Sequence, residues 1–425
     1  MNRTSAPAIA LPVDYSFQLP DYQLFTLDNG IPVYSYNQCP EPVLHLELVF
    51  PAGLWYEQKT GIANATAALL KNGTARFNAF EINEQFEQYG ASVKAAAGND
   101  WASFSLSCMS RHLEKVLPLF ASLLDEAVFP QSEIDIYIQN AKQRLSVQLK
   151  KCDFVANRLI DTYLFGSTHP YGRYSEATDL EAIHQDDLLN HLKTRYQASG
   201  CRIFLAGQFN DTHIQLLNSF LGNRTSSAHA PSVIEHPVLQ ATEKKYRVAH
   251  DATSVQGAIR LLRPFPEKQH PDFSPMILLN TVFGGYFGSR LMSNIREEKG
   301  YTYGIHSYLY NYQRLGGFII STEAGRDVCD ATLEEIYTEM KRLREEEIPA
   351  EELQLVKNYL LGNLLGELDG AFQIIQRWKN LILNGFSKDR FNDNIRIYKT
   401  TGSRELQELA NKYLQPSDFY ELVVC

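Results

Sequence analysis

The sequence has no apolar run that approaches the roughly 18–20 residues of a membrane-spanning helix, and it has no dense basic tract. It carries 40 Lys and Arg residues against 49 Asp and Glu residues, a net charge of −9. We therefore expect no nucleic-acid partner and no membrane span. The six cysteines form no CxxC pair, which favours reduced thiols over a disulfide framework or a zinc knuckle.

The N-terminal apolar stretch, residues 6–13, is short and is broken by Pro7 and Pro12. A secretory signal needs a longer uninterrupted apolar segment. The sequence therefore predicts a cytoplasmic protein, and a periplasmic location stays open if a signal has been removed from the chain.

What is present is typical of a globular protein. Hydrophobic residues make up 44% and charged residues 21% of the 425 residues, enough for sizeable cores and for two to three domains of about 150 residues. The first local signals indicate β-structure and then a helix. Asn29-Gly30 between two β-prone runs predicts a hairpin, in which both turn positions favour positive φ. Residues 43–50 alternate as a half-buried strand does, with Leu44, Leu46, Leu48 and Phe50 on one face, whereas residues 61–70 predict a helix.

The second half of the chain repeats the first. His112–Leu145 and Ala331–Leu364 both read as a helix, then an apolar residue followed by Pro-x-x-Glu, then a second helix. Aligning Pro130 with Pro349 gives an offset of 219 residues, about half the chain. We predict two homologous α+β domains, residues 1–222 and 244–425, each a mainly antiparallel sheet packed with helices. The polar stretch 223–243 is the predicted linker.

Residues 52–74 carry a resemblance to a known family. Gly53 and Glu57 precede GIANATAALLKNGT at residues 61–74, which is similar to the G-x-A-H-x-x-E-H-x-x-F-x-G-T segment of pitrilysin/insulinase-type zinc metallopeptidases, the inverzincins. The resemblance implies the processing-peptidase-like fold. In that family the two His bind zinc from one face of a helix, and the Glu between them polarises the attacking water.

At those three family positions the present chain has Asn64, Ala67 and Ala68. The family's third ligand is a Glu on a later helix. Counting back from His169-Pro170-Tyr171-Gly172, which resembles the family's H-P-x-G element, it falls at Gln143 or Arg144. A catalytic zinc needs three protein ligands and a water, so we expect no metal and no cofactor in this chain.

A second match lies in residues 284–304, which resemble the family's G-G-G-x-x-S-R-L-x-x-x-V-R-E-x-x-G-L-A-Y segment. The family's Arg and Tyr in this segment hold the substrate backbone and stabilise the oxyanion at a zinc site in the other half or subunit. Arg296 and Tyr303 occupy these positions. Two structural roles stay open: Arg296 as a cation at a helix end before Gly300, and Tyr303 as an aromatic packed on a sheet.

The resemblance implies a non-catalytic, zinc-less subunit of a heterodimeric zinc peptidase. Its partners would be a homologous zinc-bearing chain with an intact H-x-x-E-H and an extended or unfolded peptide, with Arg296 and Tyr303 acting in trans. The alternatives are an inert assembly protein and a peptide-binding homodimer on the same fold. His184 and His191 lack a ligand spacing and are expected on a solvated helix face.

Overall fold

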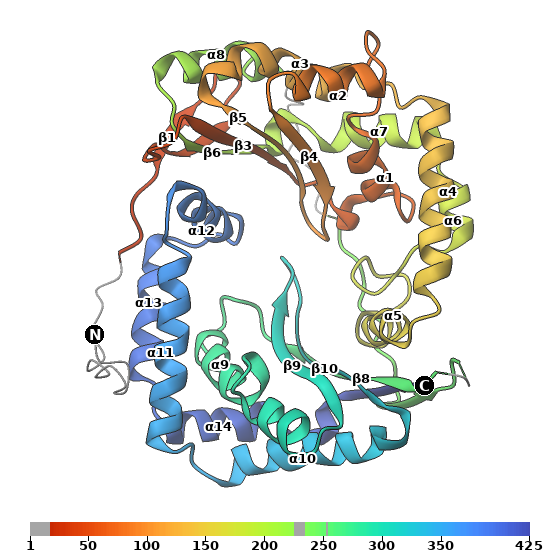
Figure 1. Cartoon of the computed structure of the whole chain (residues 1–425), viewed down its shortest axis with the longest axis vertical. Coiled ribbons are helices and arrows are strands. Elements are labelled where there is room, and N and C mark those ends of the chain that lie inside the picture. The colour runs from red at the N-terminus through yellow and green to blue at the C-terminus, as the bar shows by residue number, and fades with distance from the viewer. Residues whose placement is uncertain (1–17, 225–233, 252–253) are drawn as a thin grey trace, which may run out of the picture.

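The computed structural model describes residues 18–224, 234–251 and 254–425, and its strands form two sheets (Figure 1). The first has the order β1-β2-β6-β3-β5-β4 and the second the order β7-β11-β8-β10-β9. The strands of the first sheet are β1 (Gln23–Thr26), β2 (Pro32–Tyr36), β3 (Val43–Phe50), β4 (Ser92–Ala97), β5 (Ala102–Met109) and β6 (Arg202–Gly207). Those of the second are β7 (Lys245–Val248), β8 (Gln256–Phe265), β9 (Thr302–Asn311), β10 (Gly316–Gly325) and β11 (Tyr420–Val424).

Helices accompany both sheets. In the first half they are α1 (Ile62–Leu69), α2 (Ala79–Glu87), α3 (Leu113–Asp125), α4 (Gln131–Gln148), α5 (Cys152–Phe165), α6 (Ala177–Glu181), α7 (Gln185–Arg195) and α8 (Asp211–Leu221). In the second half they are α9 (Phe273–Asn280), α10 (Cys329–Glu345), α11 (Ala350–Gly366), α12 (Ala371–Leu383), α13 (Lys388–Thr400) and α14 (Ser403–Tyr413). Within the described residues, no helix is long and apolar enough to cross a membrane.

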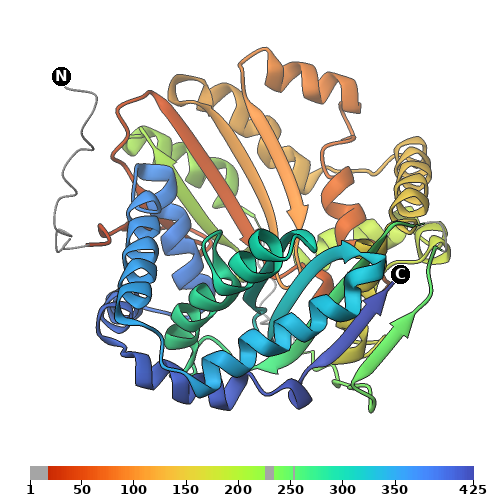
Figure 2. The same cartoon turned by 60° about the horizontal axis from the view of Figure 1, so that its bottom comes forward.

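Apart from the edge strand β1 of the first sheet, the strands of the two sheets have the same order and directions. β2 pairs parallel with β6, and β7 pairs parallel with β11, while the remaining pairs run antiparallel in the same spatial order. Figure 2 shows β11 between β7 and the rest of the second sheet. The predicted fold class, two related α+β halves, is therefore confirmed. The proposed boundaries stay predictions, and part of the linker, residues 225–233, lies outside the described residues.

The repeated Pro-x-x-Glu segment has the same conformation in both halves. Pro130 caps α4 with φ −55° and ψ 139°, and Pro349 caps α11 with φ −55° and ψ 142°. The following Glu ties each long helix to its neighbours: Glu133 accepts a hydrogen bond from Asn72 at 2.7 Å, and Glu352 pairs with Arg290 through two bonds of 2.9 Å. The sequence repeat is thus also a repeat of structure.

The predicted hairpin is present, with a different turn from the one expected. Only Gly30 has a positive φ, 86°, because the loop contains three residues and closes through a hydrogen bond from Leu27 N to Ile31 O of 3.0 Å. In such a loop one left-handed residue is sufficient, so the expectation of positive φ at Asn29 is wrong.

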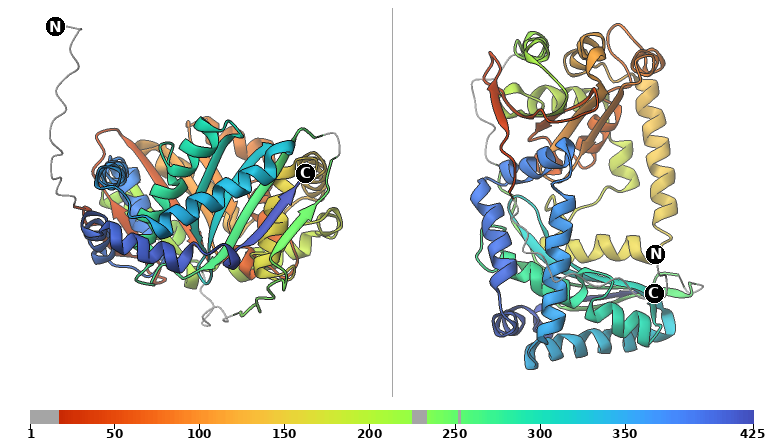
Figure 3. Two further views of the ribbon diagram at one scale, coloured as in Figure 1. Left: turned by 90° about the horizontal axis from the view of Figure 1, so that it is seen from below. Right: turned by 60° about the vertical axis from the view of Figure 1, so that its left-hand side comes forward.

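Each half covers one face of its sheet with a helix taken from the other half (Figures 1 and 3). Helix α5 of the first half packs Ala156, Ile160 and Leu164 against Leu262 and Leu422 of the second sheet. In return, α12 of the second half packs against β2 and β6 of the first sheet. Its Ile374, Ile375 and Trp378 share a core with Tyr36, Val49, Phe204 and Ala206. The exchange makes the two halves a single packed unit.

This exchange explains a departure from the predicted pattern of β3. Leu44, Leu46, Leu48 and Phe50 form a buried face, as predicted, and each is at most 1% exposed. The opposite face is also covered, because α12 lies on it: Val49 is 2% exposed. The carboxylate of Glu47 there accepts bonds of 2.8 and 3.0 Å from Lys379 and one of 3.3 Å from Gln376.

Replacing Lys379 with Met should destabilise the protein by about 3 kcal/mol, since it leaves the Glu47 carboxylate buried without its cation. The double variant Glu47→Gln/Lys379→Met should recover most of that loss. Lys388→Met, which removes a more exposed ion pair to Asp21, is the matched control and should cost less than about 1 kcal/mol. Chemical denaturation measures all three, and equal losses for Lys379→Met and Lys388→Met would contradict the inferred role of the pair.

Asp161 on α5 is expected to make the free energy of unfolding depend on pH. Burial raises the pKa of its carboxyl to about 7, although the hydroxyl of Tyr174 donates a hydrogen bond that opposes the shift. The folded state therefore holds this proton more tightly than the unfolded chain, and stability should fall as pH rises from about 4 to about 7. Asp161→Asn should remove that fall, gaining at most roughly 4 kcal/mol at pH 8 and nothing at pH 4. Thermal unfolding at the two pH values is the measurement, and parallel profiles for both proteins would contradict it.

Candidate functional site

A buried carboxylate fixes the start of α1, the helix that carries the resemblance to the zinc motif. Glu57 accepts hydrogen bonds from the backbone N–H groups of Gly61 at 3.1 Å and Ala63 at 3.0 Å, and pairs with Arg173 at 3.1 Å. Burial raises the pKa of Glu57, and these donors act against that rise. Negative charge at this position suits the unsatisfied N–H groups and the dipole of a helix N-terminus. Gly61 itself has φ 92°.

The helix presents the three substituted positions in different ways. Asn64 and Ala68, four residues apart, are exposed on one face, whereas Ala67 is 2% exposed in the core. Ala68 lines a cavity of about 530 Å³ between α1 and α4. The residues around this α1–α4 cavity are Ala68, Leu69, Asn72, Glu133, Ile136, Tyr137, Asn140, Gln143, Arg144, Val147 and Gln148. The family resemblance implies that Ala68 lies near residue 143 or 144. Ala68, Gln143 and Arg144 all line this cavity.

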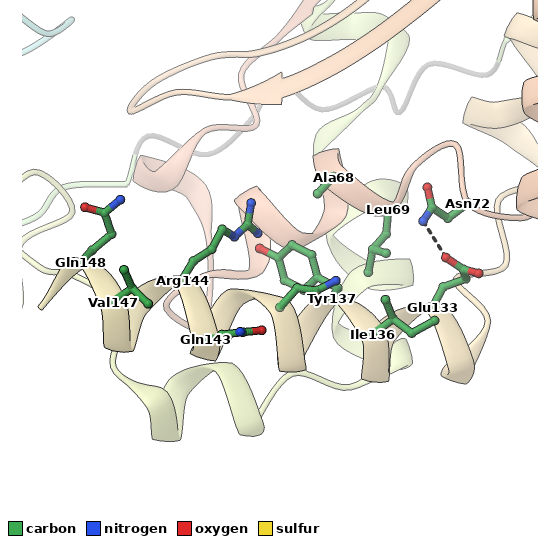
Figure 4. A pocket seen from close by; sticks show the side chains of 11 residues that line it. Ala68, Leu69, Asn72, Glu133, Ile136, Tyr137, Gln143, Arg144, Val147 and Gln148 are labelled. Atoms are coloured by element: carbon green, nitrogen blue, oxygen red, sulfur yellow. Dashed lines mark hydrogen bonds between the residues drawn. The ribbon is translucent and has the colours of Figure 1, made fainter.

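Gln143 and Arg144 differ in direction. Figure 4 shows the Arg144 side chain extending from α4 toward α1, beside the ring of Tyr137, while Gln143 lies along α4. Arg144 is exposed and forms no ion pair within the described part of the chain, so its guanidinium is available to an incoming group. Burial raises the pKa of Tyr137, and the charge of Arg144 acts against that rise.

The chemistry of the α1–α4 cavity follows from these side chains. Its one carboxylate, Glu133, is held by Asn72, and no group of three His, Cys, Asp or Glu side chains is placed to bind a metal in residues 18–224, 234–251 and 254–425. Amides, a tyrosine and a free arginine can hydrogen-bond a peptide, and Ile136 and Val147, each 52% exposed, offer apolar contact. The lining therefore sets hydrogen-bonding groups beside apolar ones.

Arg296 and Tyr303 lie together in the second half. Arg296 belongs to a π-helical segment, Met292–Glu298, and Tyr303 lies on β9. The Arg296 guanidinium lies 4.6 Å from the ring centroid of Phe287 and 5.8 Å from that of Tyr303. Its nearest carboxylate contact is Glu297, at 3.9 Å. Stacking between two rings orients the guanidinium while leaving its N–H edge free to donate.

The exposure of Tyr303 tests whether this residue is simply an aromatic packed on the sheet. Its side chain is 92% exposed, which argues against the role of an aromatic packed on the sheet. Phe287 is 61% exposed, and the Arg296 side chain between the two rings is 28% exposed, so solvent reaches all three side chains. Among the described residues, no hydrogen bond or ion pair joins Arg296 or Tyr303 to the residues of the α1–α4 cavity.

Some site residues were missed by sequence reasoning. Phe287, which stacks on Arg296, precedes it by nine residues and has no periodic relation to it. Tyr137 could have been found, because it lies seven residues before Arg144 and thus on the same face of one helix. The solvated position expected for His191 is wrong: it is buried, its ring contacts the Ala52 carbonyl at 3.1 Å, and burial lowers its pKa to about 4. His184 is exposed and caps α7.

Comparison with known proteins gives the family. One family model, described as Insulinase (Peptidase family M16), matches residues 33–169, and a second, Peptidase M16 inactive domain, matches residues 182–360. The chain belongs to peptidase family M16. The predicted resemblance to the insulinase-type peptidases is therefore confirmed.

Three relatives show how far the M16 likeness extends. The "Uncharacterized zinc protease YmxG" of Bacillus subtilis is 22% identical over 372 residues, covering 86% of this chain and 89% of that protein. The "Non-peptidase homolog YmxG" of Helicobacter pylori is 22% identical over 78% of this chain and 77% of its own length. The crystal structure of a peptidase M16 inactive domain from Pseudomonas fluorescens has a TM-score of 0.86 at 23% identity, covering 95% and 98% of the two chains, and shares the fold.

The geometry predicts that zinc ligands can be built back into this M16 chain. The triple variant Asn64→His/Ala68→His/Arg144→Glu should bind about one zinc per chain, because it supplies three ligands from facing helices. A control with Gln143→Glu in place of Arg144→Glu should bind less, since Gln143 does not extend toward α1. Metal analysis after dialysis measures both. Zinc contents that do not exceed that of the parent chain would contradict the inferred facing of α1 and α4.

Proposed function

We propose that this protein is a non-catalytic subunit of a two-chain M16 peptidase that binds extended or unfolded peptides. Two features of the chain, taken together, support this proposal. The zinc-motif positions hold Asn64, Ala67 and Ala68, while the side chain of Tyr303 is 92% exposed and that of Arg296, beside it, is 28% exposed. Outward-facing substrate-binding groups have a use when another chain brings the scissile bond to them.

In this proposal Arg296 and Tyr303 act on the carbonyl oxygen of the scissile peptide bond. The guanidinium supplies fixed positive charge and the Tyr303 hydroxyl donates one hydrogen bond as negative charge develops on that oxygen. Phe287 fixes the direction of the guanidinium by stacking on it at 4.6 Å. The homologous partner, carrying an intact H-x-x-E-H, would supply the zinc and the activated water.

A separate contribution to peptide binding comes from the α1–α4 cavity. Arg144 can pair with a carboxylate or a backbone carbonyl of the peptide, and Asn140 and Gln143 can hydrogen-bond its main chain. Ile136 and Val147, which are exposed in the single chain, would be covered by an apolar side chain of the peptide. We expect this cavity to retain peptide without cutting it.

The isolated chain should contain no stoichiometric zinc and should not cleave an unstructured fluorogenic peptide. Mixed with the zinc-bearing M16 homologue of its source, it should support cleavage. In that mixture Arg296→Ala or Tyr303→Phe should lower kcat by about 10²-fold, the scale of a lost oxyanion donor. The matched control is Arg404→Ala, which removes an exposed arginine that pairs with Glu408 at 3.6 Å.

These experiments test the non-catalytic assignment and the role of Arg296 and Tyr303 separately. Zinc binding or cleavage by the isolated chain would overturn the non-catalytic assignment. An active mixture that is insensitive to Arg296→Ala and Tyr303→Phe, with Arg404→Ala equally neutral, would reduce the pair to a structural feature. Loss of pair formation in the variants, measured by sedimentation, would place these residues in the subunit contact instead.

A second candidate is an inert assembly protein or a peptide-binding homodimer on the same fold. The similarity to a protein named a non-peptidase homolog favours it. In that case no mixture with an M16 homologue would gain activity, although the chain would still self-associate or bind the unlabelled peptide. The cleavage assay of the mixture, and sedimentation of the chain alone and with the peptide, distinguish the two candidates.

A further inference from the structure

A second cavity, of about 300 Å³, lies between α9, α12 and α13, away from the α1–α4 cavity. Figure 1 shows these three helices on the side of the second half opposite α5. The residues that line it are Lys268, Phe273, Ile277, Leu364, Arg377, Asn380, Leu381, Asn384, Phe386, Arg390, Phe391, Asn394 and Tyr398. Its volume is at the lower end of the range for small-molecule pockets, roughly 300–1,000 Å³.

Positive charge dominates this α9–α12–α13 cavity. Three of its lining residues, Lys268, Arg377 and Arg390, are cationic, and none of them is acidic. Arg377 has a carboxylate partner, Glu367 at 2.6 Å. Within the described residues, Lys268 and Arg390 have none: the Lys268 ammonium donates to the amide oxygen of Asn384 at 3.3 Å, and Arg390 donates to a backbone carbonyl. Two cations without a direct carboxylate contact thus lie in the wall of one cavity, in a chain whose net charge is −9.

Aromatic rings hold the two guanidinium groups in place. Arg377 lies over Phe391 and Arg390 over Phe386, each at 5.2 Å from the ring centroid. A guanidinium stacked by its face keeps its N–H edge for a planar, bidentate acceptor such as a carboxylate or a phosphate. The Nε of Arg377 is buried and has no hydrogen-bond partner among the described residues.

The rest of the wall is apolar or neutral. Phe273, Leu364 and Leu381 are buried core residues, and Asn380 and Asn394 add amide groups beside them. Burial lowers the pKa of Lys268, with the charge of Asp100 acting against that shift. An anion in the cavity would compensate the buried positive charge, while an apolar body attached to it would contact the aromatic wall.

We propose that the α9–α12–α13 cavity is a binding site for a small organic anion, a carboxylate or phosphate group attached to an aromatic or apolar body. Arg390 and Lys268 bind the anionic group, and the apolar wall receives the body. The site is separate from the proposed peptide site and does not depend on it.

The test is a calorimetric titration of the full chain with four probes: phenyl phosphate, benzoate, benzyl alcohol and inorganic phosphate. Phenyl phosphate or benzoate should bind at millimolar concentration or below, and benzyl alcohol and inorganic phosphate should bind at least ten times more weakly. Whichever of the first two binds more tightly identifies the anionic group. Binding should weaken as salt is added, as it does for paired charges.

Variants locate the binding. Arg390→Gln and, separately, Lys268→Gln should each weaken it at least tenfold. Arg396→Gln is the matched control, because it is an exposed arginine on α13 that pairs with Asp393 at 3.0 Å and does not line the cavity. Absence of binding by both aryl anions would overturn the proposal. So would equal binding of inorganic phosphate and phenyl phosphate, or equal effects of Arg390→Gln, Lys268→Gln and Arg396→Gln.

Discussion

The reciprocal packing of α5 and α12 is the constraint on which the rest of the molecule depends. Each helix buries its apolar face on a sheet built by the other half, so neither sheet is fully covered without both halves. The buried pair of Glu47 and Lys379 adds a charge-specific contact to that apolar seam. The two helices join the half that carries the α1–α4 cavity to the half that carries Arg296 (Figure 3).

The frame around the zinc-motif positions has structural reasons that do not involve a metal. Glu57 satisfies N–H groups at the start of α1. A side chain at Gly53 would lie 2.4 Å from the Gly98 carbonyl oxygen, and one at Gly73 would lie 2.7 Å from Pro130. These residues are needed for the chain to turn and pack whatever occupies positions 64, 67 and 68. The helix can therefore keep its place while its exposed face carries out different chemistry.

Much of the fold could be predicted from the sequence, because it rests on local signals. The Pro-x-x-Glu repeat gave the two halves, and the alternation of β3 gave its core face. The exchange of helices could not be predicted. The sequences of α5 and α12 show that each helix has an apolar face, but they do not show against which sheet that face packs. At the site, counting along the chain gave Gln143 or Arg144, and only the direction of the side chains separates the two. The burial of His191 and the stacking of Phe287 on Arg296 arise from tertiary contacts, and the sequence contains no periodic pattern that indicates them.

In the proposed function, Arg296 and Tyr303 serve a zinc site in another chain. The most direct measurement is a structure of the mixed pair with a non-cleavable extended peptide bound. We expect the Arg296 guanidinium and the Tyr303 hydroxyl to lie about 3 Å from one peptide carbonyl oxygen, which faces the zinc of the partner. A pair in which the peptide reaches the zinc while Arg296 and Tyr303 remain in solvent would contradict it.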